Sequence, residues 1–154
     1  MKDINLSEHF TLEELLESDL AVRHNISEQY IISDAILQNL KKLAINVLEP
    51  LRVIIGKPII VSSGYRCPRV NKAAKGSKTS QHMQGMAADI KVKGMTPEQV
   101  FQKITTSGLV FDQCIQEFAS KGGWVHISYD SKRLRKQRII AEKGSSGNTV
   151  YTLI

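Results

Sequence analysis

The chain has 154 residues, of which 42% are hydrophobic, and a formal net charge of +6. This length suits a single domain over residues 1–154 with one hydrophobic core. No apolar run approaches the roughly 20 residues that a membrane-spanning helix needs, so we expect no membrane insertion. With only two cysteines, the chain cannot build a closed metal site made of several thiolates.

The first residues, Met-Lys-Asp-Ile-Asn-Leu, lack the apolar centre of a secretory signal. We therefore expect no signal peptide and a protein made in the cytoplasm. Cys67 and Cys114 are then best interpreted as reduced thiols, although the sequence leaves a disulfide between them open.

The first third of the chain is predicted to be helical. Residues 11–18 form a short helix that starts with a capping box at Thr11. A longer amphipathic helix begins at Ser33 or Asp34, and its apolar residues recur every three or four positions: Ile36, Leu40, Leu43, Val47 and Leu51. Pro50 is expected to kink or end this helix, because proline lacks an N–H and crowds the preceding turn.

The rest of the chain is predicted to be mostly strands. A strand over 58–63, a helical turn over 70–74 and a strand from Ala87 come first, followed by a helix that Thr96 caps and that runs to about 106. Further strands are expected over 111–118, 124–129, 134–142 and 150–153. Short loops favour antiparallel neighbours. The fold class is therefore α+β, with N-terminal helices packed on a central antiparallel sheet.

Three residues have the spacing of metal ligands. His82 follows a polar loop, and Asp89 lies on the short apolar run that begins at Ala87. In the segment 124–129, period-two alternation places His126 and Trp124 on one face of a strand. A lone histidine is more often exposed or bonded to a neighbour, but the joint pattern favours metal. Two imidazoles and a carboxylate without a cysteine indicate a zinc site with one open position.

These residues carry a family resemblance. The pattern Ser-x-His-x-x-Gly-x-Ala-x-Asp at 80–89, the Trp-x-His at 124–126 and the preceding Ser-Gly-Tyr-Arg-Cys-Pro-Arg-Val-Asn at 63–71 resemble the zinc D-alanyl-D-alanine carboxypeptidases and related peptidoglycan peptidases. Within these peptidases the chain resembles the branch found in phages, including endolysins, and in bacterial genomes, which is subfamily A of peptidase family M15. The resemblance extends from about Leu6 to the C-terminus.

The resemblance implies a Hedgehog/DD-peptidase-like fold, Zn²⁺ held by His82, Asp89 and His126, and hydrolysis of a peptide bond next to D-alanine. It also implies that Arg66 holds the substrate or its developing oxyanion and belongs to the catalytic set. Ser80 and Trp124 are implied to contact the substrate. Each of these three has a structural alternative: an ion pair for Arg66, a loop cap for Ser80 and core packing for Trp124.

The general base departs from the family pattern. The resemblance implies a glutamate three residues before the last histidine, but Gly123 occupies that position. Glu117 is our predicted base, because a hairpin from 111–118 into 124–129 brings it near His126 in one of the possible registers. Its alternative role is that of a surface glutamate on a strand.

The basic segment Lys-Arg-Leu-Arg-Lys-Gln-Arg at 132–138 attracts polyanions. Few aromatic residues lie near it to stack on bases, so we expect a solvated strand attracted to the acidic cell wall, and no nucleic-acid binding. Peptidoglycan peptides are the expected partners of a monomer that acts on the wall after release or export by another route. Two alternatives stay open: a non-catalytic zinc-containing wall-binding module, which the missing glutamate permits, and a nucleic-acid-binding protein.

Overall fold

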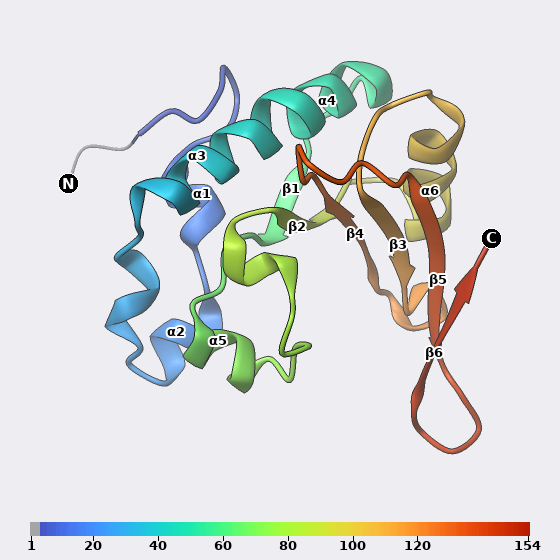
Figure 1. Cartoon of the computed structure of the whole chain (residues 1–154). Coiled ribbons are helices and arrows are strands. Elements are labelled where there is room, and N and C mark those ends of the chain that lie inside the picture. Colours follow the sequence, from blue (N-terminus) through green and yellow to red (C-terminus); the bar gives the residue numbers. More distant parts are fainter. Residues whose placement is uncertain (1–3) are drawn as a thin grey trace.

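Helices occupy the first part of the chain in the computed structural model, which describes residues 4–154 (Figure 1). The first elements are short: α1 (Leu12–Leu16), α2 (Asp19–Arg23) and the 3-10 turn η1 (Ser27–Tyr30). A long helical segment follows, made of α3 (Asp34–Leu43), η2 (Ala44–Leu48) and α4 (Glu49–Ile55). The later helical elements are α5 (Pro68–Ala73), η3 (Gln81–Gln84), α6 (Pro97–Thr106) and η4 (Ala119–Lys121). None of the helices within residues 4–154 is long and apolar enough to cross a bilayer.

The helix starts that we predicted from capping residues are confirmed. The N–H of Glu14 donates to Thr11 Oγ1 at 3.2 Å at the start of α1. Thr96 and Gln99 form a complete capping box at the start of α6. These caps satisfy N–H groups that have no partner inside a helix, which is why they mark helix starts in a sequence.

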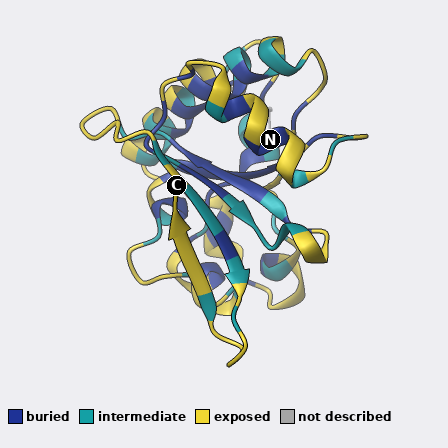
Figure 2. Cartoon of the chain, turned by 90° about the vertical axis from the view of Figure 1, so that its right-hand side faces the viewer, coloured by how far each residue is buried: buried dark blue, intermediate teal, exposed yellow. Residues whose placement is uncertain are grey.

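The strands of the described residues form one sheet in the order β1-β2-β4-β3-β5-β6. Their bounds are β1 (Ile60–Ser63), β2 (Ala87–Lys91), β3 (Gln113–Glu117), β4 (Trp124–Ser128), β5 (Gln137–Lys143) and β6 (Thr149–Leu153). The predicted α+β class is confirmed. Burial falls from the inner strands to β6 at the edge (Figure 2).

One face of the sheet is the core face. Its side chains that are at most 1% exposed belong to Ala88, Ile90, Cys114, Val125 and Ile127. The apolar side of α6 packs on β3 and β4 and joins these residues in the core. Cys67 and Cys114 are both buried free thiols, as predicted.

The opposite face presents polar groups. Asp89 on β2 is the direct partner of His126 on β4, and His126 is in turn the partner of Ile115 on β3. Residues that lie directly opposite in paired strands share a face. The register therefore places Asp89 and His126 side by side on the face that the core does not use.

We expected Pro50 to kink or end the long helix, and it does not end it. The helix continues through α4 and ends at Gly56, which adopts a left-handed φ of +74°. A proline ring crowds the carbonyl four residues back, here that of Asn46. Asn46 lies in η2, which is a π-helical turn. The wider turn makes room for the ring, so the helix absorbs the proline instead of stopping.

The expectation of antiparallel neighbours is wrong at one pair. β3 and β5 run parallel, with Ile115 opposite Ile139, while the other strand pairs are antiparallel. Both edges of β4 are already paired, so β5 crosses over to the free edge of β3. We expected this strand to start at residue 134, but β5 starts at Gln137. Residues 134–136 lie outside it because Arg135 is bonded to Asp112 instead of to a strand.

Candidate metal centre and active site

The three predicted metal ligands meet on the polar face of the sheet. His82 lies on η3, which immediately precedes β2, and its Nε2 is 3.2 Å from Asp89 Oδ1. His126 Nδ1 is also 3.2 Å from this oxygen. One ligand atom from each residue lies within 4.8 Å of the other two. The side chains are buried, with residue exposures of 3%, 4% and 8% for His82, Asp89 and His126.

Hydrogen bonds from outside the cluster orient the ligand atoms. His82 Nδ1 lies 2.7 Å from the carbonyl oxygen of Gly64. If Nδ1–H donates there, Nε2 keeps a free lone pair directed at the cluster. Arg66 Nη2 donates to Asp89 Oδ2 at 3.0 Å, and Arg66 Nε donates to Ser63 Oγ at 3.0 Å. Asp89 thus uses one oxygen toward the imidazoles and the other toward the guanidinium.

The electrostatics of the cluster suit a cation. Burial by itself raises the pKa of Asp89, but the charges and hydrogen bonds of His82 and His126 outweigh it and hold the pKa well below its ordinary value. Asp89 is therefore an anion at neutral pH. Two imidazole nitrogens and one carboxylate oxygen are a donor set that fits Zn²⁺. Within residues 4–154 no fourth histidine, cysteine or carboxylate joins the cluster.

Glu117 lies beside this cluster on β3, directly opposite Trp124. Both residues line the cleft that contains His82, Asp89 and His126. Burial and the negative charge of Asp89 raise the pKa of Glu117, while His126, the Trp124 indole and Arg66 oppose this effect. The carboxylate is therefore more basic than that of an ordinary glutamate. Its position and its pKa suit a proton acceptor.

The backbone explains why the glutamate is not at position 123. A Cβ atom on Gly123 would lie only 1.7 Å from the carbonyl oxygen of Glu117. The N–H of Gly123 also donates to the carbonyl of Phe118 at 3.0 Å, closing the turn between β3 and β4. No side chain fits at 123 in this backbone, and Glu117 on β3 supplies a carboxylate to the cleft that contains His126.

The sequence matches the model of the peptidase M15 family over residues 8–128. The chain belongs to this family. The match includes the His82, Asp89 and His126 cluster and Glu117, and it ends with the last residue of β4. A search of curated proteins finds no match. As peptidase M15 proteins are metal-dependent, this member is a hydrolase of the metallopeptidase kind that acts on peptide substrates.

The cleft of this M15 peptidase has a volume of about 740 Å³. Arg66, Ser80 and Trp124 all line it, as do the three candidate ligands. Ser80 Oγ accepts the N–H of His82 at 3.2 Å, so this serine also caps the turn that carries the ligand. Trp124 packs edge-on against Phe118 at 5.7 Å between ring centroids. Arg66, Ser80 and Trp124 thus each make the structural contact that we gave as an alternative role, and all three still line the cleft.

From the sequence we did not predict that Asp112 supports the turn that carries His82. Asp112, which is fully buried, accepts Gln81 Nε2 at 2.8 Å, and Gln81 is the residue before His82. The Arg135 guanidinium donates to both oxygens of Asp112, at 2.7 and 2.8 Å. The signal in the sequence was a lone carboxylate directly after the apolar run 109–111. Only a paired acid is stable at such a position.

Proposed function

We propose that this M15 peptidase is a zinc enzyme that hydrolyses peptide bonds in peptidoglycan stem peptides or cross-links, next to D-alanine. It acts as a carboxypeptidase or an endopeptidase. The observation that carries the proposal is the buried cluster of His82, Asp89 and His126 in one cleft with a glutamate of raised pKa. The patterns at 63–71 and 80–89 support the substrate class.

In this proposal His82 Nε2, Asp89 Oδ1 and His126 Nδ1 hold Zn²⁺. When bound, zinc polarises the scissile carbonyl and makes water nucleophilic near neutral pH. Glu117 accepts the proton of the attacking water and returns it to the leaving amine, as a general base and then a general acid. Burial in the cleft raises the pKa of this carboxylate and favours uptake of the proton, while the positive charge of bound zinc opposes this effect.

Arg66 and Trp124 position the substrate. Arg66 has Nε and Nη2 engaged with Ser63 and Asp89, whereas its Nη1 has no hydrogen bond among the described residues and the side chain lines the cleft. This remaining donor binds a substrate carboxylate or the developing oxyanion. The Trp124 ring forms an apolar wall beside Glu117, and Ser80 Oγ is a further hydrogen-bonding group at the mouth.

We further propose that residues 1–154 act as one domain and as a monomer. Peptidoglycan peptides are its partners, and it acts on the cell wall. The +6 charge favours contact with an anionic wall.

Metal content and product release test the proposal together. The purified chain should hold close to one zinc and release D-alanine from a stem pentapeptide, with activity lost on chelation and restored by Zn²⁺. The His126→Ala variant should lose the metal, whereas the exposed His24→Ala variant should keep it. Full zinc in His126→Ala contradicts the site. Zinc binding without hydrolysis of any muropeptide supports the alternative, a non-catalytic wall-binding module.

A further inference from the structure

The C-terminal hairpin of β5 and β6 lies outside the segment that matches the family, which ends at residue 128. β6 is the edge strand of the sheet and pairs only with β5 (Figure 1). It adds little to the core, because its residues are exposed or only partly buried. Yet Lys143, Thr149 and Tyr151 from this hairpin line the same cleft as the metal cluster. The hairpin therefore contributes more to the cleft than to the core.

The register places the hairpin residues on the active face. Trp124 is opposite Glu117, Glu117 is opposite Ala141, and Ala141 is opposite Tyr151. Four directly opposed residues share one face of the sheet. Between Glu117 and Tyr151 stands only the methyl group of Ala141, so the phenol is free to lean over β5. Consistent with this closeness, partial burial of the phenol and the negative charge of Glu117 raise the pKa of Tyr151, although the residue is 62% exposed overall.

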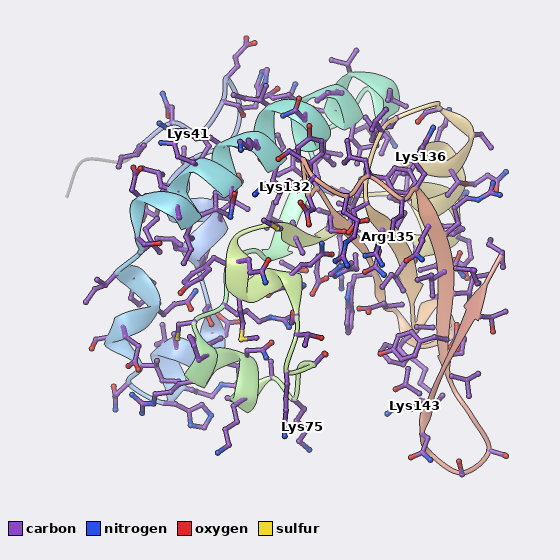
Figure 3. All side chains as sticks on the ribbon, in the orientation of Figure 1. Lys41, Lys75, Lys132, Arg135, Lys136 and Lys143 are labelled. Atoms are coloured by element: carbon purple, nitrogen blue, oxygen red, sulfur yellow. The ribbon has the colours of Figure 1, made fainter. Side chains whose placement is uncertain are left out.

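Lys143 lies one step further along the same face, two residues after Ala141, and its strand partner is Thr149. Its Nζ is 5.7 Å from the centroid of the Phe118 ring. No carboxylate of residues 4–154 forms an ion pair with it. Figure 3 shows Lys143 on the hairpin, across from Lys75 on the other side of the cleft that both residues line. The cation is therefore available to an anionic ligand.

The subsite is remote from the metal cluster. Three strand spacings of about 4.8 Å separate β4 from β6, so Tyr151 lies roughly 14 Å across the sheet from Trp124 and further from His126, which is two residues along β4. An extended peptide advances about 3.3 to 3.6 Å per residue, so about four residues span this distance. A dipeptide bound at the metal cluster cannot reach the hairpin, but a pentapeptide can.

Building on the proposed peptidase function, we propose that Lys143 and Tyr151 form a second substrate-binding subsite, which holds an acidic peptide about four residues from the scissile bond. Lys143 pairs with a carboxylate of the peptide. The Tyr151 hydroxyl donates a hydrogen bond to a peptide carbonyl, and its ring packs against the peptide where it crosses β5 and β6. The hairpin thus selects long, acidic peptides over short ones.

Substrate length separates this subsite from the catalytic centre. We would compare D-alanyl-D-alanine with an acidic pentapeptide that ends in the same dipeptide, using the parent, Lys143→Gln, Tyr151→Phe and Tyr151→Ala. KM for the pentapeptide should rise roughly threefold to tenfold in the variants, as for loss of one exposed ionic or hydrogen-bonded contact. Cleavage of the dipeptide should not change. Equal effects on both substrates, or no effect on either, overturn the subsite.

Matched controls and a binding readout keep the result interpretable. Thr152→Val alters the other face of β6, and Lys41→Gln removes one charge on α3, away from the cleft (Figure 3); neither should affect KM. Trp124 is the only tryptophan and lines the cleft, so its fluorescence reports pentapeptide binding without hydrolysis. Binding without cleavage that weakens in Tyr151→Ala supports the subsite while the proposed hydrolysis fails. Absence of pentapeptide binding by the parent overturns the subsite.

Discussion

At the scale of single residues, Asp89 joins the parts of the site. Its Oδ1 faces both imidazoles, and its Oδ2 accepts Arg66 Nη2. A buried carboxylate without partners costs several kcal/mol, so these contacts are what allow Asp89 to remain an anion in the interior. The same pair of contacts holds its coordinating oxygen in place.

The Glu117→Gln variant tests the general base. It should retain zinc and its fold but lose roughly 10²–10⁴-fold in turnover, the usual contribution of general-base catalysis. Activity of the parent should fall as the pH drops through the Glu117 pKa, which burial raises and the positive charge of bound zinc lowers. A pH–rate profile of the parent checks this. Near-normal turnover of Glu117→Gln rules out Glu117 as the base.

The Arg66→Lys variant tests how the guanidinium acts. Lysine keeps the charge but cannot reach Asp89 and Ser63 together, so zinc affinity should fall about tenfold to a hundredfold, as for other groups that orient a ligand. Competition with a chelator measures this. Arg69→Lys is the control, because Arg69 is exposed and pairs with Glu28. Unchanged zinc affinity with a higher KM assigns Arg66 to the substrate alone.

At the scale of elements, Asp112 ties two segments to the sheet. It binds Gln81 on η3 and Arg135 in the segment before β5. The same carboxylate therefore holds both the turn that carries His82 and the segment that leads into the β5–β6 hairpin, which lines the cleft. The π turn before Pro50 lets the helix continue into α4.

The turn that carries His82 also packs against α3 through Gly85. Gly85 has a φ of +72°, and a Cβ there would lie 3.0 Å from the carbonyl oxygen of Ile36.

Removal of Asp112 should destabilise the fold. Asp112→Ala leaves Arg135 and Gln81 without their partner, and loss of one member of a buried ion pair costs about 3 kcal/mol or more. Burial raises the pKa of Asp112, but the hydrogen bonds from Arg135 and Gln81 outweigh it, and the net pKa is lowered. Its contribution is therefore complete above the unfolded value of about 3.9 and is lost as the pH falls from there through the lowered folded value.

Denaturant unfolding of parent and variant measures both effects. Between about pH 6 and about pH 3, which bracket the ordinary aspartate pKa, the parent should lose more stability than Asp112→Ala. Asp130→Ala is the control, because its ion pair with Arg133 is long, at 4.0 Å. Equal pH dependence of the parent and Asp112→Ala contradicts the role of this ion pair.

At the scale of the whole molecule, the net charge is +6, and the basic segment 132–138 contributes to it. The basic side chains labelled in Figure 3 lie on α3, on the loop after α5 and on the segments around β5. A net positive charge attracts polyanions without selecting a nucleic-acid sequence.

This net charge predicts no more than weak, non-specific attraction to duplex DNA. The dissociation constant should lie at about 10⁻⁴–10⁻⁶ M at physiological salt, rise steeply with ionic strength and be independent of zinc. Fluorescence anisotropy over a range of salt concentrations, with and without a chelator, measures it. Tight binding that persists at physiological salt favours the nucleic-acid alternative over the wall peptidase.

The sequence alone determined the features that depend on neighbours along the chain. Capping residues located the starts of α1 and α6, and the spacing of His82, Asp89 and His126 identified a candidate metal site. The tertiary structure alone decided what depends on residues far apart. The β3–β4 register places Glu117 in the cleft. β5 pairs with β3 because both edges of β4 are already paired, and Asp112 bonds to Arg135, which lies 23 positions later in the sequence. A one-residue slip in register reverses the face of every side chain, and local pattern does not contain that information.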